Sequence, residues 1–65
     1  MKTPDHYSAF AIDPAHFILA NRMGFAEGNV IKYVCRHEMK GGREDLLKAI
    51  DYIEMIIKTE YDSET

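Results

Sequence analysis

The sequence predicts an all-α protein: an extended N-terminal arm followed by three helices, with a core completed by oligomerisation. Three observations predict this. Apolar residues recur at spacings of three and four along residues 43–60. Asp-Pro and Gly-Gly pairs divide the chain into short segments. A chain of 65 residues buries only about 60% of its extended surface, so its stability by itself is marginal.

The two ends of the chain are expected to lie outside the helices. Residues 1–12 contain Pro4 and a short mixed apolar run, and we expect them to form an extended arm over the core. Residues 61–65 are polar and are expected to fray. Because the chain has no linker and no internal repeat, residues 1–65 are interpreted as one small helical domain.

The first helix is expected at residues 14–23. Asp13 can cap its N-terminus, and Pro14 suits the first helical position. Gly24 is expected to end it in a left-handed conformation. Its apolar side chains point nearly all round the axis, which in so small a domain predicts a partner chain; they are Phe17, Ile18, Leu19, Ala20 and Met23.

The second and third helices are expected at residues 26–39 and 43–60, joined by a tight turn at Gly41 and Gly42. The third helix carries an a/d seam about two heptads long, formed by Leu46, Ile50, Ile53 and Ile57. This seam is a second reason to expect a homo-oligomer.

The second helix carries the most informative pattern. At about 100° per residue, five polar side chains project within an arc of roughly 100°: Asn29, Lys32, Tyr33, Arg36 and Lys40. Like charges four residues apart weaken a helix, so such a row is expected to meet anions. Arg36 offers a planar fork, and the two lysines are mobile point charges. Tyr33 can stack on a base, and Asn29 can read a base edge.

Residues outside this helix extend the predicted binding set. His6 and Tyr7 on the arm can cover a ligand by stacking and hydrogen bonding, Asp45 can orient a cation, and Lys48 can add charge. A plainer interpretation stays open. The cationic row is then a solvated face paired with acids of a neighbouring helix such as Asp45 or Asp51, and Tyr7 only fills the core.

Charge and composition limit the classes of partner that this protein is expected to bind. The formal net charge of −3 argues against binding to long nucleic acids, while residues 32–48 hold five of the eight Lys and Arg. A local basic site on an acidic protein suits a small anion. No apolar run approaches about 20 residues and no signal peptide is evident, so no membrane association is expected. Cys35 is the single cysteine and fits a reduced, cytoplasmic protein.

Catalytic and metal-binding patterns find little support. The glycine pair lacks the spacing of a phosphate-binding loop, and no Ser-His-Asp set or Glu-x-x-Glu pair for magnesium occurs. Cys35 and His37 point to different sides of a helix, so they cannot share a metal. We therefore assign no catalytic residue, no cofactor and no metal, although an active site shared between subunits stays open.

Several motifs together resemble a group of very short bacteriophage proteins, some described as nucleotide kinases of podoviruses. The motifs are His6-Tyr7, Gly28-Asn29-Val30-Ile31-Lys32-Tyr33-Val34-x-Arg36, Lys40, and Glu44-Asp45-Leu46-x-Lys48-Ala49-x-x-Tyr52. The resemblance implies a phage-encoded, nucleotide-handling protein acting in the host cytoplasm. It favours ligand-binding roles for His6, Tyr7, Asn29, Lys32, Tyr33, Arg36 and Lys40.

The leading functional hypothesis is non-catalytic sequestration of a cyclic or other small nucleotide. By analogy of size and ligand type, such a protein acts as an immune-signal sponge in anti-defence, with sites at subunit boundaries. One alternative is a nucleotide kinase or phosphohydrolase whose active site is shared between subunits. The other is an interaction module whose basic face docks on an acidic host protein.

Overall fold

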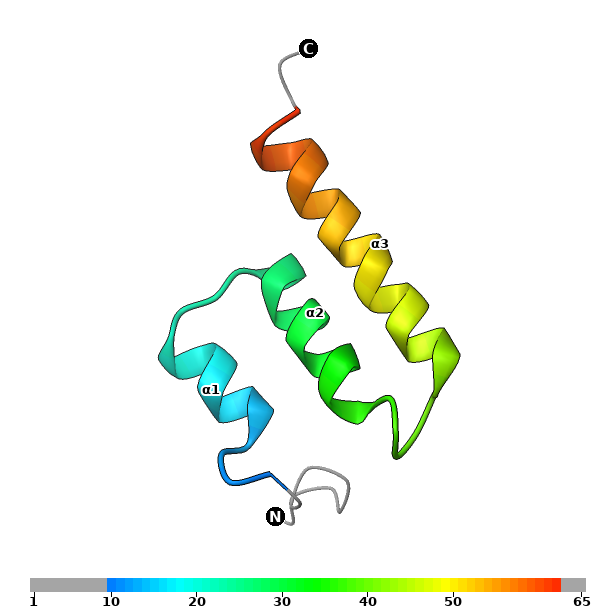
Figure 1. The fold of residues 1–65 in the computed structure, drawn as a ribbon. Coiled ribbons are helices and arrows are strands. Elements are labelled where there is room, and N and C mark those ends of the chain that lie inside the picture. Colours follow the sequence, from blue (N-terminus) through cyan, green and yellow to red (C-terminus); the bar gives the residue numbers. More distant parts are fainter. Residues whose placement is uncertain (1–9, 63–65) are drawn as a thin grey trace.

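A computed structural model describes residues 10–62 of the protein. Over this range it consists of α1 (Pro14–Ala20), α2 (Phe25–Arg36) and α3 (Arg43–Glu60), with turns between them and no strand. Contacts join α1 to α2 and α2 to α3, but not α1 to α3. The three helices therefore lie side by side in one layer (Figure 1). The all-α prediction is confirmed, while most of the expected arm lies outside the described residues.

The start of α1 is as predicted, but its end is not. The Asp13 carboxylate accepts a hydrogen bond from the Ala15 N–H at 2.9 Å. The helix then stops at Ala20, where the Asn21 side-chain amide donates to the Phe17 carbonyl at 2.9 Å and helps to satisfy the helix end. The left-handed residue is Arg22, with φ 55°. The expectation that Gly24 ends the helix was wrong, because Gly24 is extended and caps the start of α2.

The second helix ends three residues earlier than predicted, at Arg36. The chain then enters a turn in which the Gly42 N–H donates to the His37 carbonyl at 2.8 Å. Lys40 lies on this turn. Lys40 therefore lies beyond the end of the helix whose period aligned it with the cationic row, and its N–H donates to the Arg36 carbonyl at 3.0 Å.

The glycine pair makes the turn into α3 possible. Gly42 has φ 58° and ψ −133°, a conformation that residues with a Cβ rarely adopt. Gly41 lies against the carboxylate of Asp45, where a methyl group would overlap the oxygens. From this turn α3 runs over Arg43–Glu60, the bounds that the sequence predicted.

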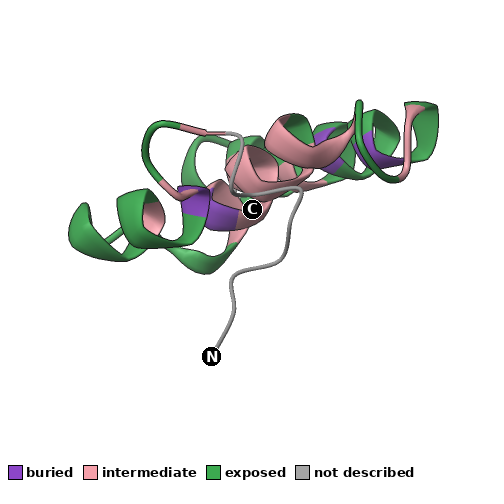
Figure 2. Cartoon of the chain, turned by 90° about the horizontal axis from the view of Figure 1, so that it is seen from below, coloured by how far each residue is buried: buried purple, intermediate pink, exposed green. Residues whose placement is uncertain are grey.

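The inner stripe of α3, which we define as Asp45, Ala49, Tyr52 and Ile56, is the less exposed side of this helix. Among the described residues only Pro14, Gly28, Asp45 and Ala49 are buried (Figure 2). The predicted a/d seam is a different set, which we call the outer stripe. Its members are 37–48% exposed: Leu46, Ile50, Ile53 and Ile57. No helix of the described part of the chain is long and apolar enough to cross a membrane.

Candidate functional site

A buried carboxylate fixes the geometry of the candidate site. Asp45 is 1% exposed. Its Oδ2 accepts from the Arg36 Nε–H at 3.1 Å and from the Gly41 N–H at 2.9 Å, and its Oδ1 accepts from the Arg36 Nη2 at 3.2 Å. The arginine fork thus binds both carboxylate oxygens, which ties the end of α2 to the start of α3.

These contacts also determine the charge of Asp45. The hydrogen bonds from Arg36 lower the pKa of this carboxyl group, helped by the Gly41 N–H and the charges of Arg36 and Lys48, although burial opposes the shift. Asp45 is therefore a carboxylate across the neutral range. The interpretation in which the cationic row pairs with acids of a neighbouring helix is confirmed for Arg36 and Asp45.

Three cations surround the ring of Tyr33. The distance to the ring centroid is 5.1 Å from the Lys32 Nζ, 4.8 Å from the Arg36 Cζ and 5.5 Å from the Lys48 Nζ. Each distance falls within the range of a cation–π contact. Two of the cations come from α2 and the third from α3, so the packing of the two helices assembles the group. We call Tyr33, Lys32, Arg36, Lys48 and Tyr52 the Tyr33 cluster.

Aromatic packing holds Tyr33 in place. Its ring stacks on that of Tyr52, with centroids 6.0 Å apart and planes 13° apart. Phe25 meets the same Tyr52 edge to face, with centroids 5.8 Å apart. These are favourable geometries for aromatic pairs. The stack crosses from α2 to α3 and gives the cations a rigid centre.

A shallow hollow opens beside the cluster. Its volume is about 340 Å³, and it is lined by Tyr33, Lys48, Asp51, Tyr52 and Met55. Because Asp51 and Lys48 both line the hollow, the negative charge of one offsets part of the positive charge of the other. The hollow is therefore less basic than the row on α2 alone predicts.

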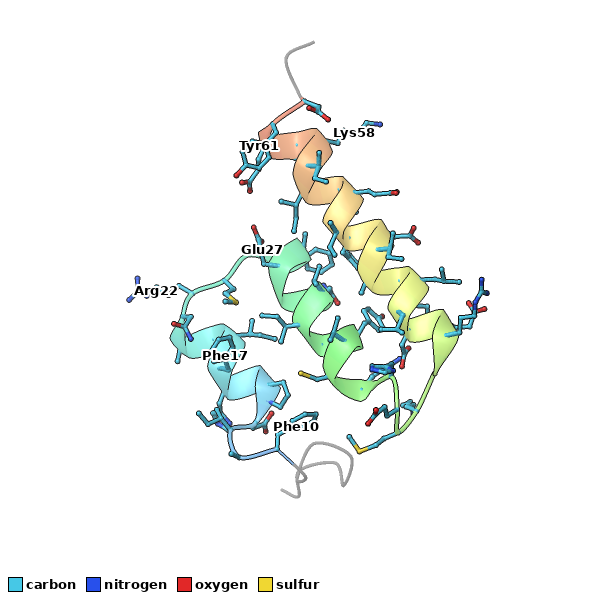
Figure 3. All side chains as sticks on the ribbon, viewed as in Figure 1. Phe10, Phe17, Arg22, Glu27, Lys58 and Tyr61 are labelled. Carbon is cyan, nitrogen blue, oxygen red and sulfur yellow. The ribbon has the colours of Figure 1, made fainter. Side chains whose placement is uncertain are left out.

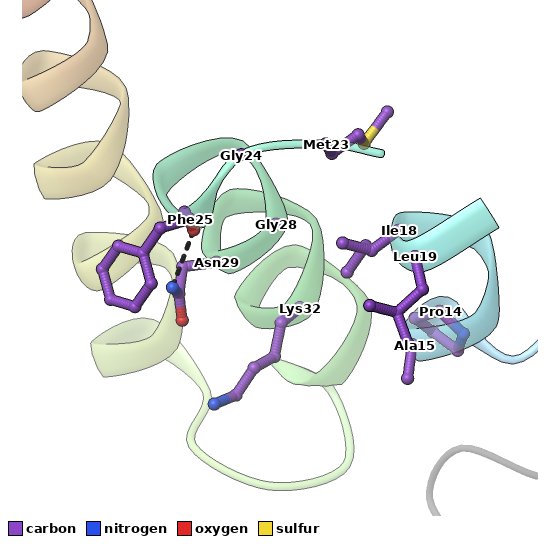
Figure 4. Close-up of a pocket in the computed structure, with 10 residues that line it drawn as sticks. All are labelled: Pro14, Ala15, Ile18, Leu19, Met23, Gly24, Phe25, Gly28, Asn29 and Lys32. Carbon is purple, nitrogen blue, oxygen red and sulfur yellow. Dashed lines mark hydrogen bonds between the residues drawn. The ribbon is translucent and has the colours of Figure 1, made fainter. Parts of the chain in front are cut away.

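A second hollow, which we call the α1–α2 groove, lies between those two helices (Figure 4). Its volume is about 370 Å³. Ile18 and Leu19 reach into it from α1, while Asn29 and Lys32 belong to α2. The Asn29 Nδ2 donates to the Phe25 carbonyl at 2.8 Å. Figure 4 shows the Lys32 amine pointing away from α1. Lys32 thus lines the groove and also belongs to the Tyr33 cluster.

The predicted site residues divide into groups. Asn29 and Lys32 line the α1–α2 groove, and Lys32, Tyr33, Arg36 and Lys48 meet around one ring. Asp45 contacts Arg36 directly, and Lys40 lies on the turn. The remaining two, His6 and Tyr7, lie outside the described residues.

Sequence reasoning missed Tyr52 and Asp51 as members of the site. Tyr52 follows Lys48 by four residues and Asp45 by seven, and that helical spacing is a signal that it shares their side of α3. Cys35 is half-buried, and partial burial raises the pKa of its thiol. Among the described residues, no three His, Cys, Asp or Glu side chains are grouped as metal ligands.

Comparison with known protein families shows to which family this chain is similar. A family model described as a protein of unknown function, DUF3310, matches residues 1–54. The chain belongs to this family. The matched residues of this chain include α1, α2, the cations of the Tyr33 cluster and the Arg36–Asp45 pair. No curated protein and no solved structure matches the chain.

Proposed function

We propose that this protein binds a small nucleotide without converting it and acts as a phage-type sequestering protein. The single observation that carries the proposal is the Tyr33 cluster, in which three cations from two helices lie within 5.5 Å of one aromatic centroid. Phosphates need charge-assisted donors and bases need aromatic surfaces. The cluster offers the donors, and the neighbouring α1–α2 groove, which is lined in part by Phe25, offers the surface for a base.

The two lysines of the cluster are the phosphate ligands in this proposal. Lys32 and Lys48 stand on different helices, and both lie near the ring of Tyr33. Arg36 has another task, because its fork is bound to the Asp45 carboxylate. It contributes positive charge and fixes the cluster, while the flexible amines reach the ligand. This division of roles differs from the sequence-based hypothesis, which gave Arg36 a ligand-binding role beside the lysines.

The α1–α2 groove is the proposed place for the base. Its volume of about 370 Å³ lies within the range of roughly 300–1,000 Å³ that is typical of small-molecule sites. Apolar side chains from α1 form one wall. On the other wall Asn29 gives one amide hydrogen to Phe25, and its oxygen and second hydrogen suit a base edge. Lys32 connects this groove to the phosphate ligands.

The chemistry of Asp45 favours holding a nucleotide over transforming it. A general base needs a pKa near the working pH and freedom to take a proton. The pKa of Asp45 is lowered by the hydrogen bonds from Arg36, and its oxygens already accept three hydrogen bonds. The carboxylate that binds Arg36 is thus a structural anchor and a weak base.

Calorimetry with nucleotides of one, two and three phosphates and with cyclic dinucleotides tests the proposal. At least one ligand is expected to bind, and Lys32→Ala or Lys48→Ala is expected to weaken it about tenfold or more. Lys58→Ala is the matched control, because it removes the same charge about 15 Å further along α3 (Figure 3). If all three variants lose affinity equally, the cluster is not the site.

Asp51→Asn supplies a test in the opposite direction. Removing this carboxylate from the wall of the hollow is expected to raise affinity about threefold at low salt, and less at high salt. Affinity that falls on this change would contradict a phosphate beside Lys48.

The fate of the ligand separates binding from catalysis. After incubation with nucleotide and magnesium, denaturation of the protein is expected to release the ligand unchanged. A converted nucleotide would instead support a kinase or phosphohydrolase. Absence of heat with every nucleotide, together with capture of an acidic host protein, would overturn nucleotide binding in favour of an interaction module.

A further inference from the structure

The outer stripe of α3 has no partner within the part of the chain that the structure describes. Stable domains consist of two or more packed layers around a core. Here the three helices form a single layer (Figure 1), and only four of the described residues are buried. The described residues therefore form one layer and lack the second layer that would cover it.

The residue numbers of its members show where the outer stripe lies around the axis of α3. Each of its members comes one residue after a member of the inner stripe, so the two stripes lie about 100° apart on the helix. The inner stripe packs toward α2, while Ile50 and Ile57 remain 48% and 45% exposed. An apolar row of this length at 4-3-4 spacing is the pattern of a helix–helix contact.

The outer stripe also lies opposite the Tyr33 cluster. Lys48, Asp51 and Met55 line the shallow hollow, and each comes one residue before a member of the inner stripe. They are therefore turned about 100° the other way, which places the hollow nearly opposite the outer stripe. A contact through the outer stripe leaves the candidate nucleotide site open to solvent.

We propose that the outer stripe binds the outer stripe of a second copy of this chain, with the two α3 helices antiparallel. Symmetry of the sequence about the midpoint between residues 51 and 52 supports this register. Pairing each residue with its mirror position joins Leu46 to Ile57 and Ile50 to Ile53. The apolar row is thus complementary to its own reverse.

Charge at the two ends of the stripe selects the antiparallel direction. Continuing the same register joins Arg43 of one copy to Glu60 of the other, at both ends of the contact. Both positions are exposed, and both lie within about 50° of the centre of the stripe. A parallel pair would bring like charges together. Antiparallel helix dipoles add a small favourable term.

The proposed contact between two α3 helices is small. An α3 helix of 18 residues is about 27 Å long, and four apolar side chains per copy make an interface below the standard size of about 800 Å² per partner. A dissociation constant of roughly 1–100 μM is therefore expected.

Sedimentation equilibrium from about 1 to 500 μM tests self-association, with circular dichroism to check folding. Ile50→Glu is expected to weaken association about tenfold or more. Met55→Glu is the matched control, because Met55 is 47% exposed against 48% for Ile50, on the opposite side of α3. A wild-type monomer at every concentration, or greater weakening by Met55→Glu, would overturn the proposal.

Charge reversal tests the direction without touching the apolar residues. Arg43→Glu alone and Glu60→Arg alone are each expected to weaken association about threefold to tenfold at low salt, and the double variant is expected to restore it. A parallel pair predicts no such rescue, so equal behaviour of the three variants would overturn the antiparallel register. Nucleotide binding by Ile50→Glu is measured separately, so failure of one proposal is distinguishable from failure of the other.

Discussion

The α2–α3 junction and the α1–α2 junction of this protein are held together by different interactions. Between α2 and α3, a buried carboxylate accepts three directional hydrogen bonds and two tyrosine rings stack. Between α1 and α2, a methyl group of Ile18 faces the bare backbone of Gly28, where an added Cβ would lie 3.0 Å away. The first junction specifies one geometry. The second depends on close apolar contact and leaves the α1–α2 groove beside it.

So small a chain thus combines one junction of directional contacts with one that leaves a groove open. The polar junction fixes the Arg36 guanidinium and the ring of Tyr33, around which the flexible side chains of Lys32 and Lys48 lie. The apolar junction contributes one wall of the α1–α2 groove. Breaking each junction separately is therefore the most direct way to test the contrast.

The largest effect is expected from Asp45→Ala. It removes the acceptor of three hydrogen bonds from a position that is 1% exposed, and loss of a charged buried partner is strongly destabilising. The midpoint of thermal unfolding is expected to fall by about 10 °C or more, measured by circular dichroism. Asp51→Ala removes an exposed acid of the same helix and serves as control. Equal midpoints of thermal unfolding for the two variants would show that the buried Asp45 carboxylate does not hold the α2–α3 junction together.

Acid should weaken the same junction. The pKa of Asp45 is lowered in the folded state by the hydrogen bonds from Arg36. Its contribution to stability is therefore present above the unfolded pKa of about 3.9 and is lost as pH falls through the lower folded value. Thermal melts at pH 7, 5, 3 and 2 are expected to show a difference between wild type and Asp45→Asn that shrinks below pH 4. A constant difference would show that the charge of Asp45 is not what stabilises the junction.

The turn between α2 and α3 should give a smaller loss. Gly42→Ala forces a Cβ into φ 58°, at a cost of about 1–3 kcal/mol in the free energy of unfolding. Urea titration measures this cost. Gly24→Ala is the control, since Gly24 has φ −74° and an added methyl meets the flexible end of the Glu27 side chain. If Gly24→Ala costs as much, the conformation of Gly42 is not the cause.

The smallest effect on global stability is expected at the apolar junction. Ile18→Ala removes half-buried methyl groups that face Gly28, with a cost of about 1 kcal/mol. Native-state hydrogen exchange is expected to speed up for amides of α1, while those of α2 and α3 stay protected. Uniform loss of protection would mean that the two junctions unfold as one unit.

Local signals predicted much of the fold. The Asp13-Pro14 pair specified the start of α1, and the spacing of apolar residues specified α3 to its ends, because both depend on neighbours in sequence. The ends of α1 and α2 were predicted three residues too late. At the end of α1 the Asn21 side chain bonds to a backbone carbonyl, and after α2 the chain enters the turn that Asp45 stabilises. The spacing of apolar residues does not predict these contacts.

The candidate site was predicted only in part for the same reason. One helical face placed Asn29, Lys32, Tyr33 and Arg36 near each other, as geometry within a helix requires. It did not reveal that Tyr52 stacks on Tyr33, nor that Lys48 joins the cations around that ring. Those contacts bring together residues more than ten positions apart, through the angle at which α2 and α3 pack.

The sequence by itself determined the all-α class, the turn at Gly41 and Gly42, and the presence of a cationic row and an apolar seam. Periodicity and turn chemistry are local, so they can be interpreted without coordinates. Only the tertiary structure decided which stripe of α3 faces α2. It also decided that Arg36 binds Asp45 and that the apolar seam is the exposed outer stripe. These outcomes depend on the rotation of one helix against another, and a shift of one residue, about 100°, exchanges one face for its neighbour.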